Sequence, residues 1–133
     1  MLGLFKSKKQ VSQMKILVVD DEPDLVSTVE YRLKFANCQV VTAGNGQEGL
    51  ERAAAEKPDL ILLDTNMPGM NGHEMLERLR ADPALQHIPV IMVTTRGEAE
   101  SMEAGFESGC NDYLTKPIDS VALLAKVRDH LGL

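Results

Sequence analysis

Short runs of consecutive apolar residues alternate with longer amphipathic stretches along this chain of 133 residues, and the pattern repeats five times. The apolar runs show little polar alternation, which is typical of strands buried on both faces of a parallel sheet. The predicted strands are Lys15–Asp20, Gln39–Ala43, Asp59–Asp64, Val90–Thr94 and Asp112–Thr115. Repeated strand, crossover and strand units of this kind predict an α/β fold.

The stretches between the predicted strands, and the one after the last, carry apolar residues at helical spacing, and each group predicts one buried helical face. The groups are Leu25, Val26, Val29 and Leu33, then Leu50, Ala53 and Ala54, then Met75, Leu76 and Leu79, then Met102 and Phe106, and finally Val121, Leu124, Val127 and Leu131. Asp119 or Ser120 is expected to cap the last helix. We therefore predict a doubly wound, five-stranded parallel sheet of flavodoxin-like order 2-1-3-4-5, with helices on both faces.

Length and charge predict one domain at residues 15–133, preceded by a flexible basic tail at residues 1–14. Of the 14 Lys and Arg residues, four lie in the first fifteen positions without any acid, while the whole chain has net charge -6. Such an acidic body disfavours nucleic-acid binding, which depends on cations that neutralise phosphates. The sequence has no apolar run long enough to span a membrane, and its two isolated cysteines favour a reduced cytoplasm over a zinc site or a disulfide framework.

Polar side chains follow the predicted strands at their carboxyl ends. They are Asp20, Asp21, Asp64, Thr94 and Lys116. The strands are expected to be parallel, so these residues should meet at one edge of the sheet, where ligands bind in such folds. Carboxylates that converge without His or thiolate suit Mg²⁺, whereas a lysine ammonium complements a phosphoryl group.

The combination of a divalent cation, an anion-binding lysine and a hydroxyl donor indicates phosphoryl transfer, which depends on positioning and charge neutralisation. A carboxylate can itself be the nucleophile and form an aspartyl phosphate. We assign that role to Asp64, because it lies between the other acids and the lysine in the sequence and leads into a tight turn.

Four segments resemble the receiver domain of bacterial two-component response regulators, of the stand-alone, chemotaxis-regulator-like kind. They occur in the correct order and span about Lys15 to Leu131. The segments are Val18 to Pro23 (VVDDEP), Asp64 to Gly72 (DTNMPGMNG), Val93-Thr94, and Gly109 to Pro117 (GCNDYLTKP).

The resemblance implies a role for each matching residue. Asp64 would accept a phosphoryl group from a histidine kinase, and Asp20, Asp21, Asp64 and the backbone carbonyl of Asn66 would hold one Mg²⁺ ion. Lys116 would bind the phosphoryl oxygens, and its peptide bond to Pro117 would be cis. Thr94 and Tyr113 would switch position on phosphorylation, and the face formed by the fourth helix, fifth strand and fifth helix would signal to a partner protein.

Four positions of the resemblance carry residues that bear on the chemistry. Asn71 stands in a turn where many receivers have Asp, and Thr95 follows the switch threonine where the family often has a smaller residue. The resemblance implies that Asn66, Thr95 and Arg96 tune the lifetime of the phosphoryl group. Thr95 and Arg96 are bulky enough to hinder access of water or of a partner to the site.

Two other interpretations compete with this reading. The segment Gly44 to Gly49 (GNGQEG) satisfies a dinucleotide-binding fingerprint, but that role leaves Thr94 and Lys116 unexplained. A packing role for Gly46 and Gly49 at a helix start is the simpler reading. A small phosphatase with an aspartate nucleophile is the enzymatic alternative, but such enzymes have a second acid two residues after the nucleophile, where this chain has Asn66.

The chain is expected to catalyse only its own phosphorylation and dephosphorylation and to act as a cytoplasmic monomer or weak dimer. No effector domain is expected after the fifth helix, so the signal should leave through contact with another protein. Two outputs stay open. The domain acts either as a switch that binds a target, or as a relay that passes its phosphoryl group to a histidine phosphotransfer domain.

Overall fold

The computed structural model describes residues 14–95 and 109–132. Five parallel strands form one sheet in the order β2-β1-β3-β4-β5, as predicted. The strands are β1 (Lys15–Val19), β2 (Gln39–Ala43), β3 (Leu60–Asp64), β4 (Val90–Thr94) and β5 (Asp112–Thr115). Strands β3 and β4 are buried along their whole length, which explains their unbroken apolar sequence.

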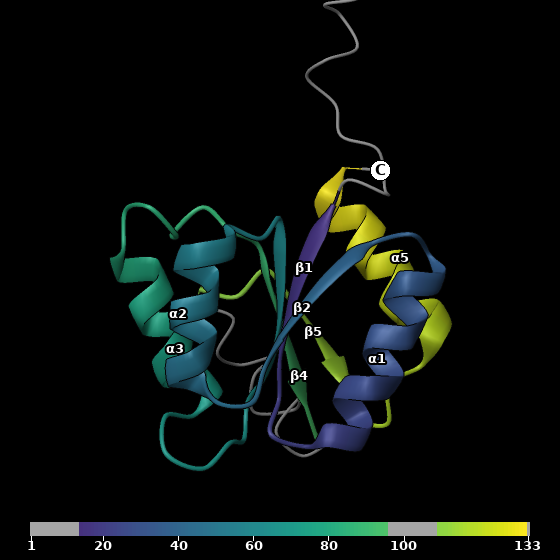
Figure 1. Ribbon diagram of the computed structural model, residues 1–133, viewed down its shortest axis with the longest axis horizontal. Coiled ribbons are helices and arrows are strands. Elements are labelled where there is room, and N and C mark those ends of the chain that lie inside the picture. Colours follow the sequence, from purple (N-terminus) through teal and green to yellow (C-terminus); the bar gives the residue numbers. More distant parts are fainter. Residues whose placement is uncertain (1–13, 96–108, 133) are drawn as a thin grey trace, which may run out of the picture.

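Helices cover both faces of the sheet, with α2 and α3 on one side and α1 and α5 on the other (Figure 1). Their bounds are α1 (Pro23–Phe35), α2 (Gly46–Glu56), α3 (Gly72–Ala81) and α5 (Ser120–Leu131). The predicted fourth helix around Met102 and Phe106 lies outside the described residues. No described helix has the length and apolar character needed to cross a membrane.

Side chains at three helix starts fix where those helices begin. Asn45, Asn71 and Asp119 accept hydrogen bonds from the backbone N–H groups of Glu48, Glu74 and Ala122. Each bond satisfies an N–H that has no partner within its own helix. The cap at Asp119 confirms one of the two predicted alternatives. Asn71 thus has a structural role, because an amide oxygen serves there as an N-cap.

The helical faces were predicted well for α3 and less well for α2 and α5. Met75, Leu76 and Leu79 are all buried. By contrast, Ala54 is exposed, and Gly49 takes its place against the neighbouring helix, where a Cβ would lie 2.9 Å from Met75 Sδ. Val121 is 76% exposed, and Leu123 is buried instead. Both errors arise because helical spacing alone does not fix which side of a short apolar stripe faces the sheet.

The two ends of the described domain are held by polar contacts. Met14, which the sequence analysis assigns to the tail, is buried, and its carbonyl accepts a hydrogen bond from Gln39 N–H. At the other end, the Asp112 carboxylate of β5 pairs with Lys126 at 2.7 Å and His130 at 2.9 Å on α5. These contacts fix α5 against the edge strand of the sheet.

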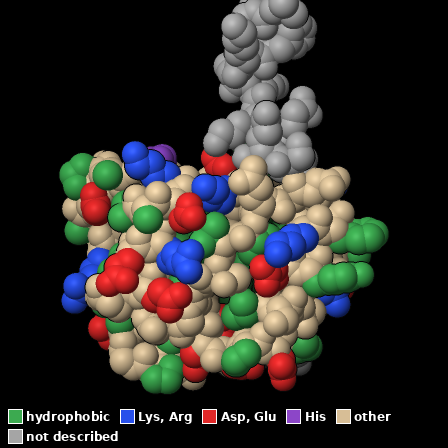
Figure 2. All heavy atoms as spheres, in the orientation of Figure 1, with side chains coloured by type: hydrophobic (Ala, Val, Ile, Leu, Met, Phe, Trp, Pro, Cys, Tyr) green, Lys and Arg blue, Asp and Glu red, His purple; other side chains and the backbone are tan. Residues whose placement is uncertain are grey.

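Acidic and basic side chains are intermixed on the face shown in Figure 2, and no large area of a single sign stands out there.

Candidate functional site

The carboxyl ends of β1, β3 and β4 bring the predicted site residues together. Asp64 is the last residue of β3, Asp20 directly follows β1, and Thr94 is the last residue of β4. The parallel registers place Val19 opposite Leu63 and Asp64 opposite Val93, so the three positions lie at one level of the sheet. Sequence positions far apart therefore form one site at the predicted edge.

An acidic cluster forms the centre of this site. Asp20, Asp21 and Asp64 each offer a carboxylate oxygen, and these three oxygens lie within 4.8 Å of one another. Asp20 and Asp64 are buried, whereas Asp21 is exposed. Oxygen ligands at this spacing, one of them open to solvent, fit a hard cation such as Mg²⁺ that retains several waters.

The Asp64 carboxylate is held by one oxygen and unpaired at the other. Its Oδ1 accepts a hydrogen bond from Asn66 N–H at 3.3 Å and lies 3.3 Å from Lys116 Nζ. Its Oδ2 is buried and has no hydrogen-bond partner among the described residues. A buried carboxylate oxygen without a partner is costly in a protein interior. A bound cation or a phosphoryl group would satisfy it, so the donor set fits both.

Electrostatics agree with this arrangement. Burial, and next the charge of Asp20, raise the pKa of Asp64 to about 6. Burial also raises the pKa of Asp20, against the lowering effect of Glu22 N–H and Lys116. Burial acts to lower the pKa of the Lys116 ammonium, but the carboxylates of Asp20 and Asp64 outweigh it and raise that pKa. One lysine cannot neutralise both buried carboxylates, and a bound cation would supply the missing positive charge.

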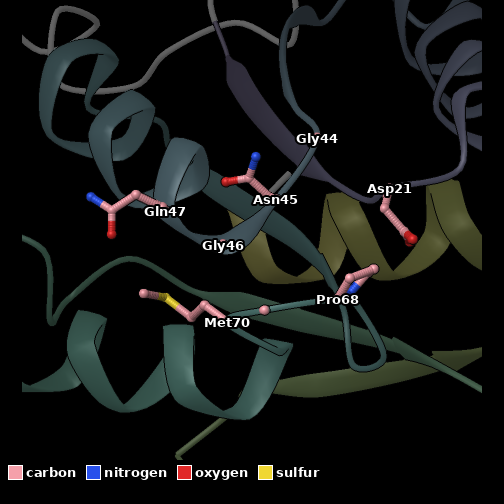
Figure 3. Close-up of a pocket in the computed structure, with 8 residues that line it drawn as sticks. Asp21, Gly44, Asn45, Gly46, Gln47, Pro68 and Met70 are labelled. Atoms are coloured by element: carbon pink, nitrogen blue, oxygen red, sulfur yellow. The ribbon is translucent and has the colours of Figure 1, made fainter.

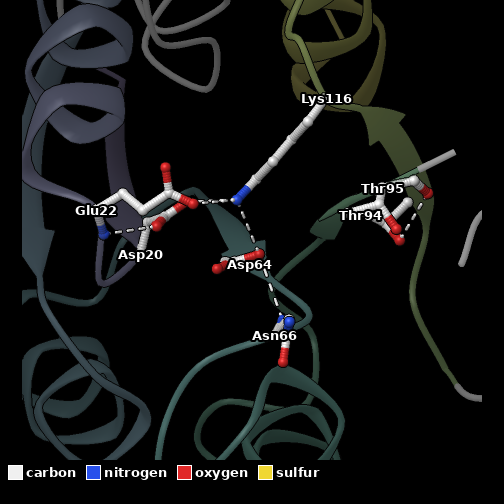
Figure 4. A network of polar contacts seen from close by, with 7 residues as sticks. All are labelled: Asp20, Glu22, Asp64, Asn66, Thr94, Thr95 and Lys116. Atoms are coloured by element: carbon white, nitrogen blue, oxygen red, sulfur yellow. Dashed lines mark hydrogen bonds and ion pairs between the residues drawn. The ribbon is translucent and has the colours of Figure 1, made fainter.

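Lys116 reaches the acidic cluster from the end of β5, as Figure 4 shows. Its backbone N–H donates to the carbonyl oxygen of Thr94 at 2.7 Å, and its peptide bond to Pro117 is cis, as the resemblance implied. Its ammonium lies 3.5 Å from Asp20 Oδ2 and 3.2 Å from Glu22 Oε1. Glu22 lies within one of the matching segments, but no feature of that segment predicted a role for its side chain.

The predicted switch residues lie beside this cluster. Thr94 is fully buried, and its hydroxyl donates to the carbonyl oxygen of Thr95 at 3.3 Å (Figure 4). Tyr113 is half-buried and packs against the core cluster under α2 and α3. Of the three residues predicted to tune the phosphoryl lifetime, Thr95 and Asn66 are exposed next to the site. Arg96, the third of them, lies outside the described residues.

An open cleft of about 490 Å³ begins at Asp21 and runs between the β2–α2 and β3–α3 loops (Figure 3). Gly46 lies on one side and Met70 on the other, and a Cβ on Gly46 would lie 2.8 Å from the Met70 carbonyl oxygen. Gly46 is therefore required by loop packing, as Gly49 is required by helix packing. The glycine-rich segment is explained without a dinucleotide.

Comparison with known proteins agrees with the geometry. A family model described as "Response regulator receiver domain" matches residues 16–128. The response regulator PleD of Caulobacter vibrioides is 45% identical over 114 residues, which cover 86% of this chain and 25% of that protein. Protein PilH of Pseudomonas aeruginosa is 40% identical over 113 residues, covering 85% of this chain and 93% of that protein.

A solved structure of a response regulator has the same fold. The chemotaxis response regulator CheY4 of Vibrio cholerae superimposes with a TM-score of 0.82 at 31% identity, covering 89% of this chain and 98% of that one. The chain thus spans nearly the full length of PilH and CheY4, but only a quarter of PleD.

Proposed function

The chain belongs to the response regulator receiver domain family, and on that premise we propose that Asp64 accepts a phosphoryl group from a histidine kinase or a histidine phosphotransfer domain. One observation carries the proposal: Asp64 Oδ1 is held by two donors while the buried Oδ2 has no partner among the described residues. A carboxylate held by one oxygen keeps the lone pairs of the other oxygen for a cation or for attack on phosphorus.

The reaction transfers a phosphoryl group from a histidine side chain of the donor protein to Asp64. An Asp64 oxygen attacks the phosphorus of the donor phosphohistidine, and the phosphorus–nitrogen bond breaks. The electron pair stays on the imidazole nitrogen, which takes up a proton, and Asp64 becomes an acyl phosphate. The role of the protein is to orient the carboxylate and to neutralise charge on the phosphoryl oxygens, which is the main requirement of such transfers.

Charge neutralisation is divided between a cation and a side chain. Mg²⁺ would be held by Asp20, Asp21, Asp64 and the carbonyl of Asn66, and when bound it would screen the acidic cluster from the incoming phosphoryl group. Lys116 supplies the other positive charge, and its ammonium already lies 3.3 Å from Asp64 Oδ1. Thr94 offers a hydroxyl one strand away.

Phosphorylation would change the surface through which the domain signals. A phosphoryl group carries nearly two negative charges and three acceptor oxygens, so it offers Thr94 a stronger partner than the Thr95 carbonyl. Movement of Thr94 would make room for Tyr113 and alter the face of the domain that includes β5 and α5. The exposed Val121 on α5 offers an apolar contact to a protein partner there.

The proposed role also bears on catalysis, location and assembly. The chain would catalyse only its own phosphorylation and dephosphorylation, would act in the cytoplasm as a monomer or weak dimer, and would signal to a protein target. Sustained hydrolysis of a phosphate monoester would contradict the first of these. Rapid transfer of the phosphoryl group to a histidine phosphotransfer domain would make the chain a relay.

Intact-mass spectrometry tests the proposal. The protein is incubated with Mg²⁺ and acetyl phosphate, and adducts are followed over time for the wild type, for Asp64→Asn and for the surface control Asp129→Asn. We expect one phosphoryl adduct on the wild type and on the control, dependent on Mg²⁺, and none on Asp64→Asn. Labelling of a correctly folded Asp64→Asn protein would overturn the assignment, as would a wild type that binds Mg²⁺ but forms no adduct.

A further inference from the structure

We propose that Glu22 is a displaceable partner of Lys116, which holds the ammonium until a phosphoryl oxygen takes its place. The inference rests on the proposed function and adds a positioning residue to it. Its basis is the group of three carboxylates around one lysine: Glu22 Oε1 at 3.2 Å, Asp64 Oδ1 at 3.3 Å and Asp20 Oδ2 at 3.5 Å from Lys116 Nζ.

A lysine ammonium has three N–H donors and no acceptor. The three carboxylates can therefore engage all of its donors, and a phosphoryl oxygen can bind Lys116 only if one carboxylate leaves. Asp64 stays beside Lys116 in this proposal, because that residue carries the phosphoryl group itself.

Burial distinguishes the other two partners. The Asp20 side chain is 4% exposed, whereas that of Glu22 is 63% exposed. Separating a buried carboxylate from its cation leaves an unpaired charge in a poorly solvated place, which is strongly unfavourable. A largely exposed carboxylate returns to water at little cost. Glu22 is therefore the partner that leaves.

The local structure leaves the Glu22 side chain free for this role. Glu22 is the N-cap residue of α1, yet its side chain makes no capping hydrogen bond. Its backbone N–H is fixed by Asp20 Oδ1 at 2.9 Å, so the residue has a defined position while its carboxylate extends to Lys116 (Figure 4). Glu22 is also not among the three acids whose oxygens lie within 4.8 Å of one another.

The test compares initial rates of phosphorylation by acetyl phosphate at saturating Mg²⁺, with the Mg²⁺ affinity of each variant measured separately. Glu22→Gln removes the competing partner, and we expect its rate to rise roughly two- to fivefold, the range that a partly exposed ion pair can account for. Glu22→Asp keeps the charge on a side chain one methylene shorter, so its contact with Lys116 is weakened and its rate should also rise.

Two controls separate this contact from general repulsion of the anionic donor. Asp24→Asn removes one exposed negative charge in the first turn of the same helix and should leave the rate unchanged. In a Lys116→Ala background, Glu22→Gln should give no gain. An equal gain in Asp24→Asn, a Glu22→Asp rate equal to wild type, or a gain that persists without Lys116 would each overturn the inference.

The outcomes also distinguish this inference from the proposed function. If the wild type forms no adduct, both the proposed function and the role of Glu22 are contradicted. A wild type that is phosphorylated on Asp64, with a Glu22→Gln variant that folds normally and reacts at the same rate, leaves the proposed function intact and removes the role of Glu22 alone.

Discussion

Gly72 packs directly against the backbone of Asp64, so closely that a Cβ on Gly72 would lie 2.2 Å from the Asp64 carbonyl oxygen. Gly72 begins α3, and its N–H donates to the Thr65 carbonyl at 3.2 Å. The start of this helix therefore fixes the position of Asp64. The role of the glycine follows from a close approach of two backbone segments.

Gly72→Ala should destabilise the fold by about 3 kcal/mol, because the added methyl group overlaps backbone that cannot move without displacing Asp64. Thermal or urea unfolding measures the change. Gly44→Ala is the matched control, since a Cβ there would meet nothing closer than Glu48 Oε2 at 3.9 Å. A Gly72→Ala protein as stable as the control would contradict the close packing.

The raised pKa of Asp64 predicts a pH-dependent stability in the absence of Mg²⁺. Because the pKa is about 6 in the folded protein against 3.8 for the ordinary group, ionisation is disfavoured by folding. Stability is fully present below pH 3.8 and is lost as the pH rises through about 6, by up to roughly 3 kcal/mol. Asp64→Asn avoids this loss.

We therefore expect Asp64→Asn to have a higher Tm than the wild type at pH 8 in EDTA, with a difference that shrinks at pH 5. Differential scanning calorimetry at the two pH values checks this. Mg²⁺ should stabilise the wild type more than the variant, since it binds the folded carboxylate cluster. A variant less stable than wild type at pH 8 would show that Asp64 is not held in the unfavourable environment described above.

Lys116→Ala should retain Mg²⁺ binding but uncouple phosphorylation from the switch. The acidic cluster is unchanged, whereas the phosphoryl oxygens lose the ammonium that would draw them toward β5. The amide NMR signals of Thr94 and Tyr113, recorded before and after phosphorylation, measure the switch. Shifts of normal size in the variant would count against the assigned role of Lys116.

Arg80 of α3 ties together two loops at the opposite edge of the sheet. Its guanidinium donates to the carbonyls of Gly109, Gln86 and Ile88 at 2.8–3.0 Å and to Asn111 Oδ1 at 2.9 Å. Arg80→Ala leaves these acceptors without their donor and should cost about 2–3 kcal/mol.

Urea unfolding compares Arg80→Ala with Arg78→Ala, which removes an exposed arginine from the same helix and should change stability by less than about 0.5 kcal/mol. Arg80→Lys should restore little, because one ammonium cannot reproduce the planar fork that reaches several acceptors at once. Equal stability of Arg80→Ala and Arg78→Ala would mean that the hydrogen bonds make no net contribution.

The sequence alone predicted the strands, their parallel order and the residues that meet at the candidate site. Strands β2, β4 and β5 have the predicted limits, and β1 and β3 differ by one residue. The signal is strongest for β3 and β4, because a parallel strand buried on both faces needs a continuous apolar run. The same pattern placed Asp20, Asp64 and Lys116 at strand ends, and the parallel direction of the strands brings such ends together. These features are local or periodic, and a sequence displays them directly.

Only the tertiary structure decided which groups touch. The burial of Leu123 in place of Val121, the contact between Gly72 and Asp64, and the reach of Arg80 to Asn111 all depend on the angle and distance between packed elements. Glu22 shows the same limit within the site: its sequence position beside two aspartates is compatible with metal binding, helix capping or solvent exposure. Its contact with Lys116, 94 positions away in the chain, arises because packing brings the end of β5 beside the start of α1.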